Sequence, residues 1–189
     1  MSRDRVVIYE AAGADPEADL MVIENEHGRT RVRAVPDHAE MTALVGRLAG
    51  EGVDRFELCG SFGALWHAEA RRVLEERTPV SAIYYGFESL ASVASYKARF
   101  EAGEVLSEAF IIVHEGADPD SHRVVRHRDD GSGTTIVAVP DLDAAAELAA
   151  KLAGELQLIE LYGVRGPAEA EPVIRAVVAA GVPVGMSAF

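Results

Sequence analysis

The chain has 189 residues, of which 49% are hydrophobic and 26% charged, the balance of an ordinary globular protein. Its 31 acidic residues outnumber 18 basic ones and give a net charge of -13, so its electrostatic field repels phosphate backbones and disfavours nucleic-acid binding. Cys59 is the only cysteine, which excludes an internal disulfide, and no apolar run reaches the length of a membrane span. We expect a soluble, cytoplasmic protein with no nucleic-acid or membrane partner.

The first predicted elements are a strand and a hairpin. An apolar run at residues 6–9 predicts a short buried strand, which ends at the turn Gly13-Ala14-Asp15-Pro16. Proline disfavours helical backbone at Asp15, and an Asp side chain can bond the backbone two residues on. Two alternating runs, at residues 20–24 and 30–35, flank a glycine-containing turn and predict a β-hairpin.

Two helices and two further strands complete this first unit. Asp37 and Glu40 have the spacing of a capping box, and apolar residues at helical spacing follow as far as Gly50. A strand at residues 53–59 comes next, and a Gly-x-x-Gly turn, a second helix and a strand after Pro79 follow it. Strands that alternate with helices through short loops predict a parallel sheet with right-handed crossovers.

The remaining sequence repeats this unit after a connecting helix, predicted at residues 89–102 with Ser89 as its N-cap. Matching motifs recur 103 or 104 residues apart, which indicates a duplicated and fused unit. The second hairpin turn is predicted at residues 130–133, and Pro172 is expected in the first turn of the last helix. The motifs of the second copy are Gly-Ala-Asp-Pro at 116–119, Ala-Val-Pro-Asp at 138–141, Leu-Ala-Gly-Glu at 152–155, Glu-Leu-Tyr-Gly at 160–163 and Pro-Val at 183–184.

The predicted fold class is therefore α/β, with two tandem homologous units. Each unit is expected to be a mainly parallel sheet with a β-hairpin and two helices, and the two to be related by a pseudo-two-fold axis. The predicted boundaries are residues 1–88 for the first repeat, 89–106 for the connecting helix and 107–189 for the second repeat.

The motif Glu57-Leu58-Cys59-Gly60-Ser61-Phe62-Gly63, with a Gly-Ala-Asp-Pro turn before it and a Pro-Val strand after it, resembles a small prokaryotic domain family of unknown function. Its members are single units, so this chain resembles two of them in tandem, over nearly all of its length. The resemblance implies no activity, cofactor or catalytic residue. The second copy departs from the motif at Tyr162 and Arg165, so we expect the first copy to hold any family-type site.

Glu57 and Glu160 are the candidate catalytic residues. Each lies in an apolar run of a predicted buried strand, where a carboxylate must be paired, protonated or bound to a ligand. Burial would raise its pKa and suit it to general acid or base chemistry. The alternative is a glutamate near the strand end that reaches solvent or a loop amide, and this reading is slightly favoured.

The candidate ligand-binding residues lie in the turns at the carboxyl ends of the strands, where ligands bind in parallel α/β sheets. The Gly-x-x-Gly turns could present amides to an anion, although a plain turn is the better explanation. Turn formation also explains the two aspartates, and a small buried residue explains the cysteine. Aromatic residues such as Trp66 could wall a pocket or pack in the core. The candidates are Asp15, Cys59, Gly60, Gly63, Asp118, Tyr162, Arg165 and Gly166.

Two functions from different classes stay open. The chain binds or transforms a small molecule at the strand carboxyl ends around the repeated glutamate, or it is a non-catalytic structural or interaction protein without such a site. The sequence assigns no cofactor, and no metal is predicted: ligation by Asp15 and Asp118 beside the glutamates is a minority interpretation, and His67-Ala68-Glu69 lacks the spacing of a zinc motif. We expect a monomer that is a pseudo-dimer of two units, or a homodimer through exposed aromatic residues.

Overall fold

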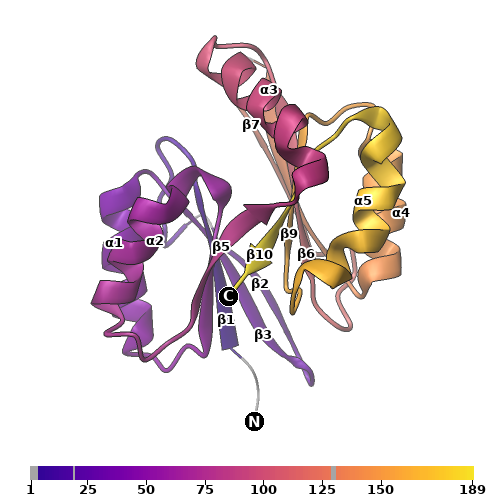
Figure 1. The fold of residues 1–189 in the computed structure, drawn as a ribbon. Helices are drawn as coiled ribbons and strands as arrows, with labels where there is room; N and C mark the ends of the chain where they lie inside the picture. Colours follow the sequence, from indigo (N-terminus) through magenta and orange to yellow (C-terminus); the bar gives the residue numbers. More distant parts are fainter. Residues whose placement is uncertain (1–3, 19, 129–130) are drawn as a thin grey trace. The chain divides into compact units, whose positions relative to one another are not determined.

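The computed structural model describes residues 4–18, 20–128 and 131–189. The chain divides into two compact units, one made of the residues up to Ile83 together with Ser187–Phe189, and the other of Tyr84–Met186 (Figure 1). We call them the first and the second repeat. The domain boundaries predicted above rest on motif spacing and stay a prediction, as does the pseudo-two-fold axis. Asp130, in the predicted hairpin turn, lies outside the described residues.

The first repeat is a five-stranded sheet with the order β2-β3-β1-β4-β5. Strand β1 pairs in parallel with β3 and β4, β4 pairs in parallel with β5, and only β2 is antiparallel, as the outer strand of the hairpin. Helices α1 and α2 pack against each other (Figure 1). The elements are β1 (Asp4–Glu10), β2 (Leu20–Asn25), β3 (Gly28–Val35), α1 (His38–Ala49), β4 (Arg55–Leu58), a 3-10 turn (Gly60–Phe62), α2 (Gly63–Val73) and β5 (Val80–Tyr85).

The second repeat has the same strand order, β7-β8-β6-β9-β10, with β7 antiparallel and the other pairs parallel. Equal strand orders confirm that the chain holds two copies of one α/β unit. The elements are a 3-10 turn (Phe87–Ser89), α3 (Leu90–Glu101), β6 (Ser107–Val113), β7 (Arg123–His127), β8 (Gly133–Val139), α4 (Leu142–Leu152), β9 (Leu158–Tyr162), a 3-10 turn (Pro167–Ala170), α5 (Glu171–Val177), a 3-10 turn (Val178–Ala180) and β10 (Val184–Ala188).

One of the predicted helix starts is correct and another is wrong. Helix α5 begins at Glu171 with Pro172 in its first turn, as expected. Ser89, however, makes no side-chain cap for α3. Its side chain is buried, and its hydroxyl oxygen accepts a hydrogen bond of 3.4 Å from the Val184 amide. The sequence pattern predicted that the Ser89 hydroxyl would cap the helix. It instead accepts the hydrogen bond of a strand amide, because a buried amide needs a partner.

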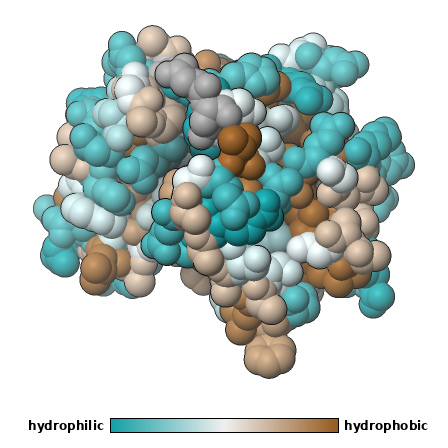
Figure 2. Space-filling model, turned by 90° about the horizontal axis from the view of Figure 1, so that it is seen from above, coloured by the Kyte–Doolittle hydropathy of each residue, from teal (hydrophilic) through white to brown (hydrophobic). Residues whose placement is uncertain are grey.

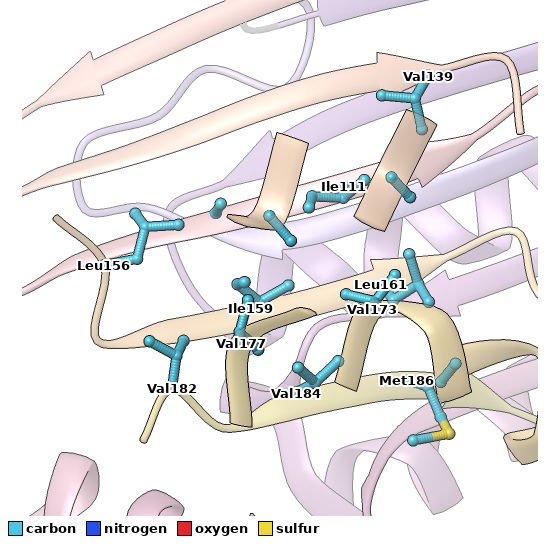
Figure 3. Packing of buried hydrophobic residues seen from close by; sticks show 14 of the residues in the cluster. Ile111, Val139, Leu156, Ile159, Leu161, Val173, Val177, Val182, Val184 and Met186 are labelled. Atoms are coloured by element: carbon cyan, nitrogen blue, oxygen red, sulfur yellow. The ribbon is translucent and has the colours of Figure 1, made fainter. Parts of the chain in front are cut away.

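The core of the second repeat lies between its sheet and the pair α4 and α5. Figure 3 shows Val173 and Val177 of α5 pointing toward Ile159 and Leu161 of β9, and all four are at most 1% exposed. Alternate residues of a strand face opposite sides of the sheet. Phe110, Glu160 and Tyr162 therefore occupy the face away from these two helices, which is where the polar groups described below lie.

On the face drawn in Figure 2, hydrophobic residues form small, separate patches among hydrophilic ones. Within the residues that the structure describes, no helix combines the length and the apolar character needed to cross a bilayer.

The two helix N-caps offer a first test of the duplication. The Asp37 carboxylate accepts a hydrogen bond of 2.9 Å from the Glu40 amide, and the Asp141 carboxylate accepts one of 2.8 Å from the Ala144 amide. We expect Asp37→Ala and Asp141→Ala each to lower the free energy of unfolding by about 1 kcal/mol, measured by urea denaturation. Effects that differ several-fold would show that the two caps are not equivalent.

Candidate functional site

In the first repeat, the predicted catalytic glutamate lies in an ion-pair cluster. Glu57 is 0% exposed on β4, and its Oε1 atom lies 3.5 Å from Nη1 of Arg5 and 3.0 Å from Nη2 of Arg55. Arg5 is itself buried, and its Nε donates a hydrogen bond of 2.7 Å to the Thr30 hydroxyl. Burial lowers the pKa of the Arg5 guanidinium, and the charge of Glu57 opposes that effect. The carboxylate is therefore held between two guanidinium groups, one buried and one partly exposed.

In the second repeat, the equivalent glutamate is held by phenols. Glu160 is 3% exposed on β9; Tyr162 donates a hydrogen bond of 2.5 Å to its Oε2, and Tyr85 donates one of 3.4 Å to its Oε1. Tyr162 is 0% exposed and packs edge-on against Phe110, with 5.9 Å between ring centroids. These hydrogen bonds from phenol groups stabilise the buried carboxylate.

Strand register identifies which residues replace one another. Arg5 pairs with Arg55 and with Thr30, while Glu108 pairs with Leu158 and with Thr134. The second repeat therefore carries Glu108 where the first carries Arg5, and an apolar residue where the first carries Arg55. The duplication has reversed the charge beside the repeated glutamate, so the two sites have different chemistry.

Glu108 has its own set of donors. Thr134 donates a hydrogen bond of 2.7 Å to it, Tyr96 one of 2.9 Å and Arg128 one of 2.9 Å. Burial, and next the nearby glutamate charges, raise the pKa values of Tyr85 and Tyr96 above the ordinary value of 10.0. Both phenols therefore stay protonated at neutral pH and act as donors to the carboxylates.

Both predicted aspartates shape turns. The Asp15 carboxylate accepts a hydrogen bond of 2.9 Å from the Glu17 amide. The Asp118 carboxylate accepts one of 2.6 Å from the Ser121 hydroxyl and one of 3.1 Å from the Asp120 amide. These bonds to its charged form lower the pKa of Asp118, with the Ser121 bond as the largest cause. The observed contacts are those of aspartate-stabilised turns.

The glycine turns differ between the repeats. In the first, Gly60 begins a 3-10 turn and Gly63, at φ 59, begins α2; Cys59 is buried, with its Sγ 3.0 Å from the Ser61 hydroxyl. In the second, Gly166 is extended and precedes a 3-10 turn. There Arg165 donates hydrogen bonds of 2.8 Å to Glu169 from both its backbone amide and its Nε. The Glu169 carboxylate thus binds the amide and guanidinium of Arg165, which an external anion would use in the alternative interpretation of this turn.

A group of four side chains lies at the carboxyl edge of the first repeat's sheet. The His38 ring stacks on Trp66, with centroids 4.5 Å apart and planes 19° apart, and it contacts the edge of Phe62 at 5.6 Å. Its Nε2 lies 4.0 Å from Oε2 of Glu10, the last residue of β1. The side chains of His38 and Glu10 are 32% and 31% exposed, while Phe62 is buried beside them. We call Glu10, His38, Phe62 and Trp66 the carboxyl-edge cluster.

The second repeat lacks this cluster at the equivalent positions. Val113 ends β6 where Glu10 ends β1, and Leu142 follows its N-cap where His38 follows Asp37. The positions of Phe62 and Trp66 hold Arg165 and Glu169. Since the second repeat builds the same sheet without these four residues, the unit does not need them to fold.

Sequence patterns missed most of these groups. Glu10 and His38 stand at the ends of elements, where single polar residues are ordinary, and nothing in the spacing joins them. Arg5 and Glu108 were hidden in the same way. The one available signal was the motif comparison, because each of these positions changes its chemical type between the copies.

Other places where a ligand could bind are groups of metal-binding side chains and cavities near the two glutamates. Within residues 4–18, 20–128 and 131–189, no three His, Cys, Asp or Glu side chains gather in a way that would hold a metal ion. A cavity of about 550 Å³ is found in the second repeat. It lies beside the amino ends of β9 and β10, and neither predicted glutamate lines it.

The chain belongs to a family of unknown function, DUF6506, whose family model matches residues 4–98 and again residues 106–189. Two successive matches confirm the predicted tandem duplication of a domain of unknown function. A comparison with curated protein sequences found no match.

The solved structures that this chain resembles share little of its sequence and superpose on it only weakly. One is a carbohydrate transporter from Acidothermus cellulolyticus 11B in complex with myo-inositol, at 12% identity and a TM-score of 0.32, with 97% of this chain and 73% of that chain covered. Another is an ABC transporter solute binding protein from Clostridium phytofermentas with bound L-rhamnose, at 14% identity and a TM-score of 0.32, with 92% and 64% covered. A third is a CobK precorrin-6A reductase, at 16% identity and a TM-score of 0.29, with 98% and 87% covered.

Proposed function

We propose that the protein binds a small molecule at the carboxyl edge of the first repeat's sheet, on the carboxyl-edge cluster. The observation that carries this proposal is the presence of the four residues in one repeat and their replacement in the other. A packing role would be needed in both copies of the unit. A binding role is needed only in the copy that keeps the site.

The position of the cluster supports binding. In open α/β sheets, ligands bind outside the carboxyl ends of the strands, near the turns that lead into helices. Glu10 ends β1, His38 begins α1 directly after β3, and Phe62 and Trp66 belong to the turn and helix after β4. Cys59, Gly60 and Gly63, from the predicted binding set, shape the same turn and are included in the proposed site.

The chemistry of the cluster indicates the kind of ligand. An imidazole can donate and accept hydrogen bonds, and a carboxylate accepts them. Both groups are about one third exposed beside an indole ring, so a ligand can reach them without unfolding the site. The ligand we expect has hydroxyl or amine groups for Glu10 and His38, and an apolar part that packs beside Trp66.

Replacement by the second repeat's own residues tests the site. Trp66 is the only tryptophan, so its fluorescence reports on this cluster alone. A panel of sugars, nucleosides, amino acids and carboxylic acids is titrated while fluorescence and the melting temperature are recorded. We expect a ligand that changes the fluorescence and raises the melting temperature of the wild type. His38→Leu and Glu10→Val should each weaken that ligand at least about tenfold, a loss of about 1.4 kcal/mol.

The matched controls are Leu142→Ala and Val113→Ala, at the equivalent positions of the second repeat. They should leave ligand affinity unchanged. Affinity that survives both His38→Leu and Glu10→Val would refute the proposal, and so would an equal loss in the controls. Since leucine and valine occupy these positions in a folded repeat, the melting temperature without ligand should change little.

Catalysis at Glu57 and Glu160 stays a prediction, and the alternative is a protein without a small-molecule site. The ion pairs of Glu57 favour a structural role, because its carboxylate already binds two guanidinium groups of the protein. If the Glu57→Gln variant bound the ligand but lost turnover, the hypothesis that Glu57 is catalytic would be supported. The predicted monomer also stays a prediction, and light scattering against the 20.2 kDa chain mass tests it.

A further inference from the structure

Within the second repeat, helix α3 makes few contacts with the other elements and lines a cavity. The helix runs from Leu90 to Glu101, and none of its residues is buried. The cavity, of about 550 Å³, lies between α3 and the two turns that lead into β9 and β10. Its polar lining includes Ser92, Ser95, Tyr96, Arg99 and Gln157, and its apolar lining includes Leu156, Val182 and Pro183. We call this cavity the α3 groove. Its volume falls within the range of small-molecule sites.

The groove presents hydrogen-bonding groups that the protein itself leaves unused. In the part of the chain that the structure describes, no hydrogen bond involves the hydroxyls of Ser92 and Ser95, which are on adjacent turns of α3. Arg99 binds Glu104 through its Nε at 2.7 Å, and no described residue pairs with its two Nη groups. The phenol of Tyr96 is directed to Glu108, at 2.9 Å, so its ring is fixed as a wall.

The duplication again shows that this hollow is a particular property of the second repeat. The turn before β10 is Ala180-Gly181-Val182-Pro183, whereas the equivalent turn before β5 is Glu76-Arg77-Thr78-Pro79. Glu76 and Arg77 carry long charged side chains; Glu76 forms an ion pair with Arg71 of α2, and Arg77 forms one with Glu75. Small neutral residues therefore leave space in the second repeat at the position where charged side chains stand in the first.

Charge decides the class of ligand. Among the described residues, Arg99 is the only charged one that lines the groove, and Glu104 already neutralises it. An anion would compete with Glu104 and would approach a chain of net charge -13, while a cation would meet Arg99. A neutral molecule with several hydroxyl groups avoids both costs, bonds the serine hydroxyls and the guanidinium, and places its C–H groups on Tyr96 and the apolar lining. We propose that the α3 groove is a second binding site, for a neutral polyhydroxylated molecule such as a monosaccharide.

Amide NMR tests the site directly, with D-glucose and D-ribose as probes. We expect saturable shifts of the amides of Ser92, Ser95, Gly154 and Gly181, with a dissociation constant in the millimolar range or below. Amides of the first repeat should not move, which separates this site from the carboxyl-edge cluster. Inorganic phosphate and acetate serve as the anionic comparison and should give no saturable shift.

A matched pair of variants on α3 completes the test. Ser95→Trp fills the groove, whereas Ala94→Trp places the same side chain on an exposed neighbour that does not line it. We expect Ser95→Trp to abolish the saturable shifts and Ala94→Trp to keep them. Ser92→Ala, which removes only a hydroxyl, should weaken sugar binding several-fold without blocking the groove.

Three results would overturn the proposal. Shifts that rise linearly with either sugar would show a solvent effect, and sugar binding that persists in Ser95→Trp would place it elsewhere. Saturable binding of phosphate or acetate with none of either sugar would show that the groove takes anions. If no ligand bound at the carboxyl-edge cluster, these outcomes would stay the same, because the two sites lie in different repeats.

Discussion

Replacing Glu57 by leucine should lower the free energy of unfolding by about 3–5 kcal/mol, the usual cost of removing one partner of a buried ion pair. Arg5 would keep its Thr30 bond but lose the carboxylate that offsets its burial. Arg55, whose side chain is 29% exposed, can turn to solvent and adds less to the loss. Urea unfolding at pH 7 measures the change.

Two further variants separate charge from packing. The double variant Arg5→Leu/Glu57→Leu should recover much of the lost stability, because it removes both charges and leaves apolar groups of similar shape. Glu160→Leu should cost about 1–3 kcal/mol, since it leaves the buried phenols of Tyr162 and Tyr85 without this acceptor. If Glu57→Leu cost no more than Glu160→Leu, the ion-pair account of the first repeat would be wrong.

Alkaline pH should destabilise the protein through its buried tyrosines. The folded state raises the pKa values of Tyr85 and Tyr96 above 10.0, chiefly by burial and next by the glutamate charges. The folded state therefore holds these protons more tightly than the unfolded chain does. The stabilisation is fully present below pH 10 and falls above it, by about 1.4 kcal/mol per pH unit for each tyrosine.

Phenylalanine variants test whether Tyr85 and Tyr96 cause this loss of stability at alkaline pH. Tyr85→Phe and Tyr96→Phe should each remove about one tyrosine's share of the slope between pH 10 and 12, while Tyr84→Phe, at an exposed position, should leave it unchanged. Chemical denaturation at several pH values gives the slopes. A slope that is the same in all variants would mean that other groups cause the loss.

The order and type of the elements could be read from the sequence because the forces behind them are local. Proline and glycine restrict the backbone at the Gly13–Pro16 turn, Asp37 and Asp141 cap their helices, and apolar periodicity separates strand from helix. The duplication could be predicted for another reason: motifs that recur at one offset are found by comparing the sequence with itself, without any structure. The capping role of Ser89 failed because a buried strand amide competed for its hydroxyl.

The partners of the polar groups were decided by tertiary structure. Glu57 and Glu160 occupy matching positions in similar apolar runs, yet one contacts arginines and the other tyrosines. Arg55 and Tyr162 lie two residues from their glutamate on the same strand, whereas Arg5 and Tyr85 come from other strands. Glu10 and His38 likewise meet across separate elements. Which side chains face each other depends on strand register and on the alternation of faces, and these are set by the pairing of distant segments. The sequence thus determined a duplicated α/β unit with a repeated glutamate, and the fold alone decided the charge and the contacts around it.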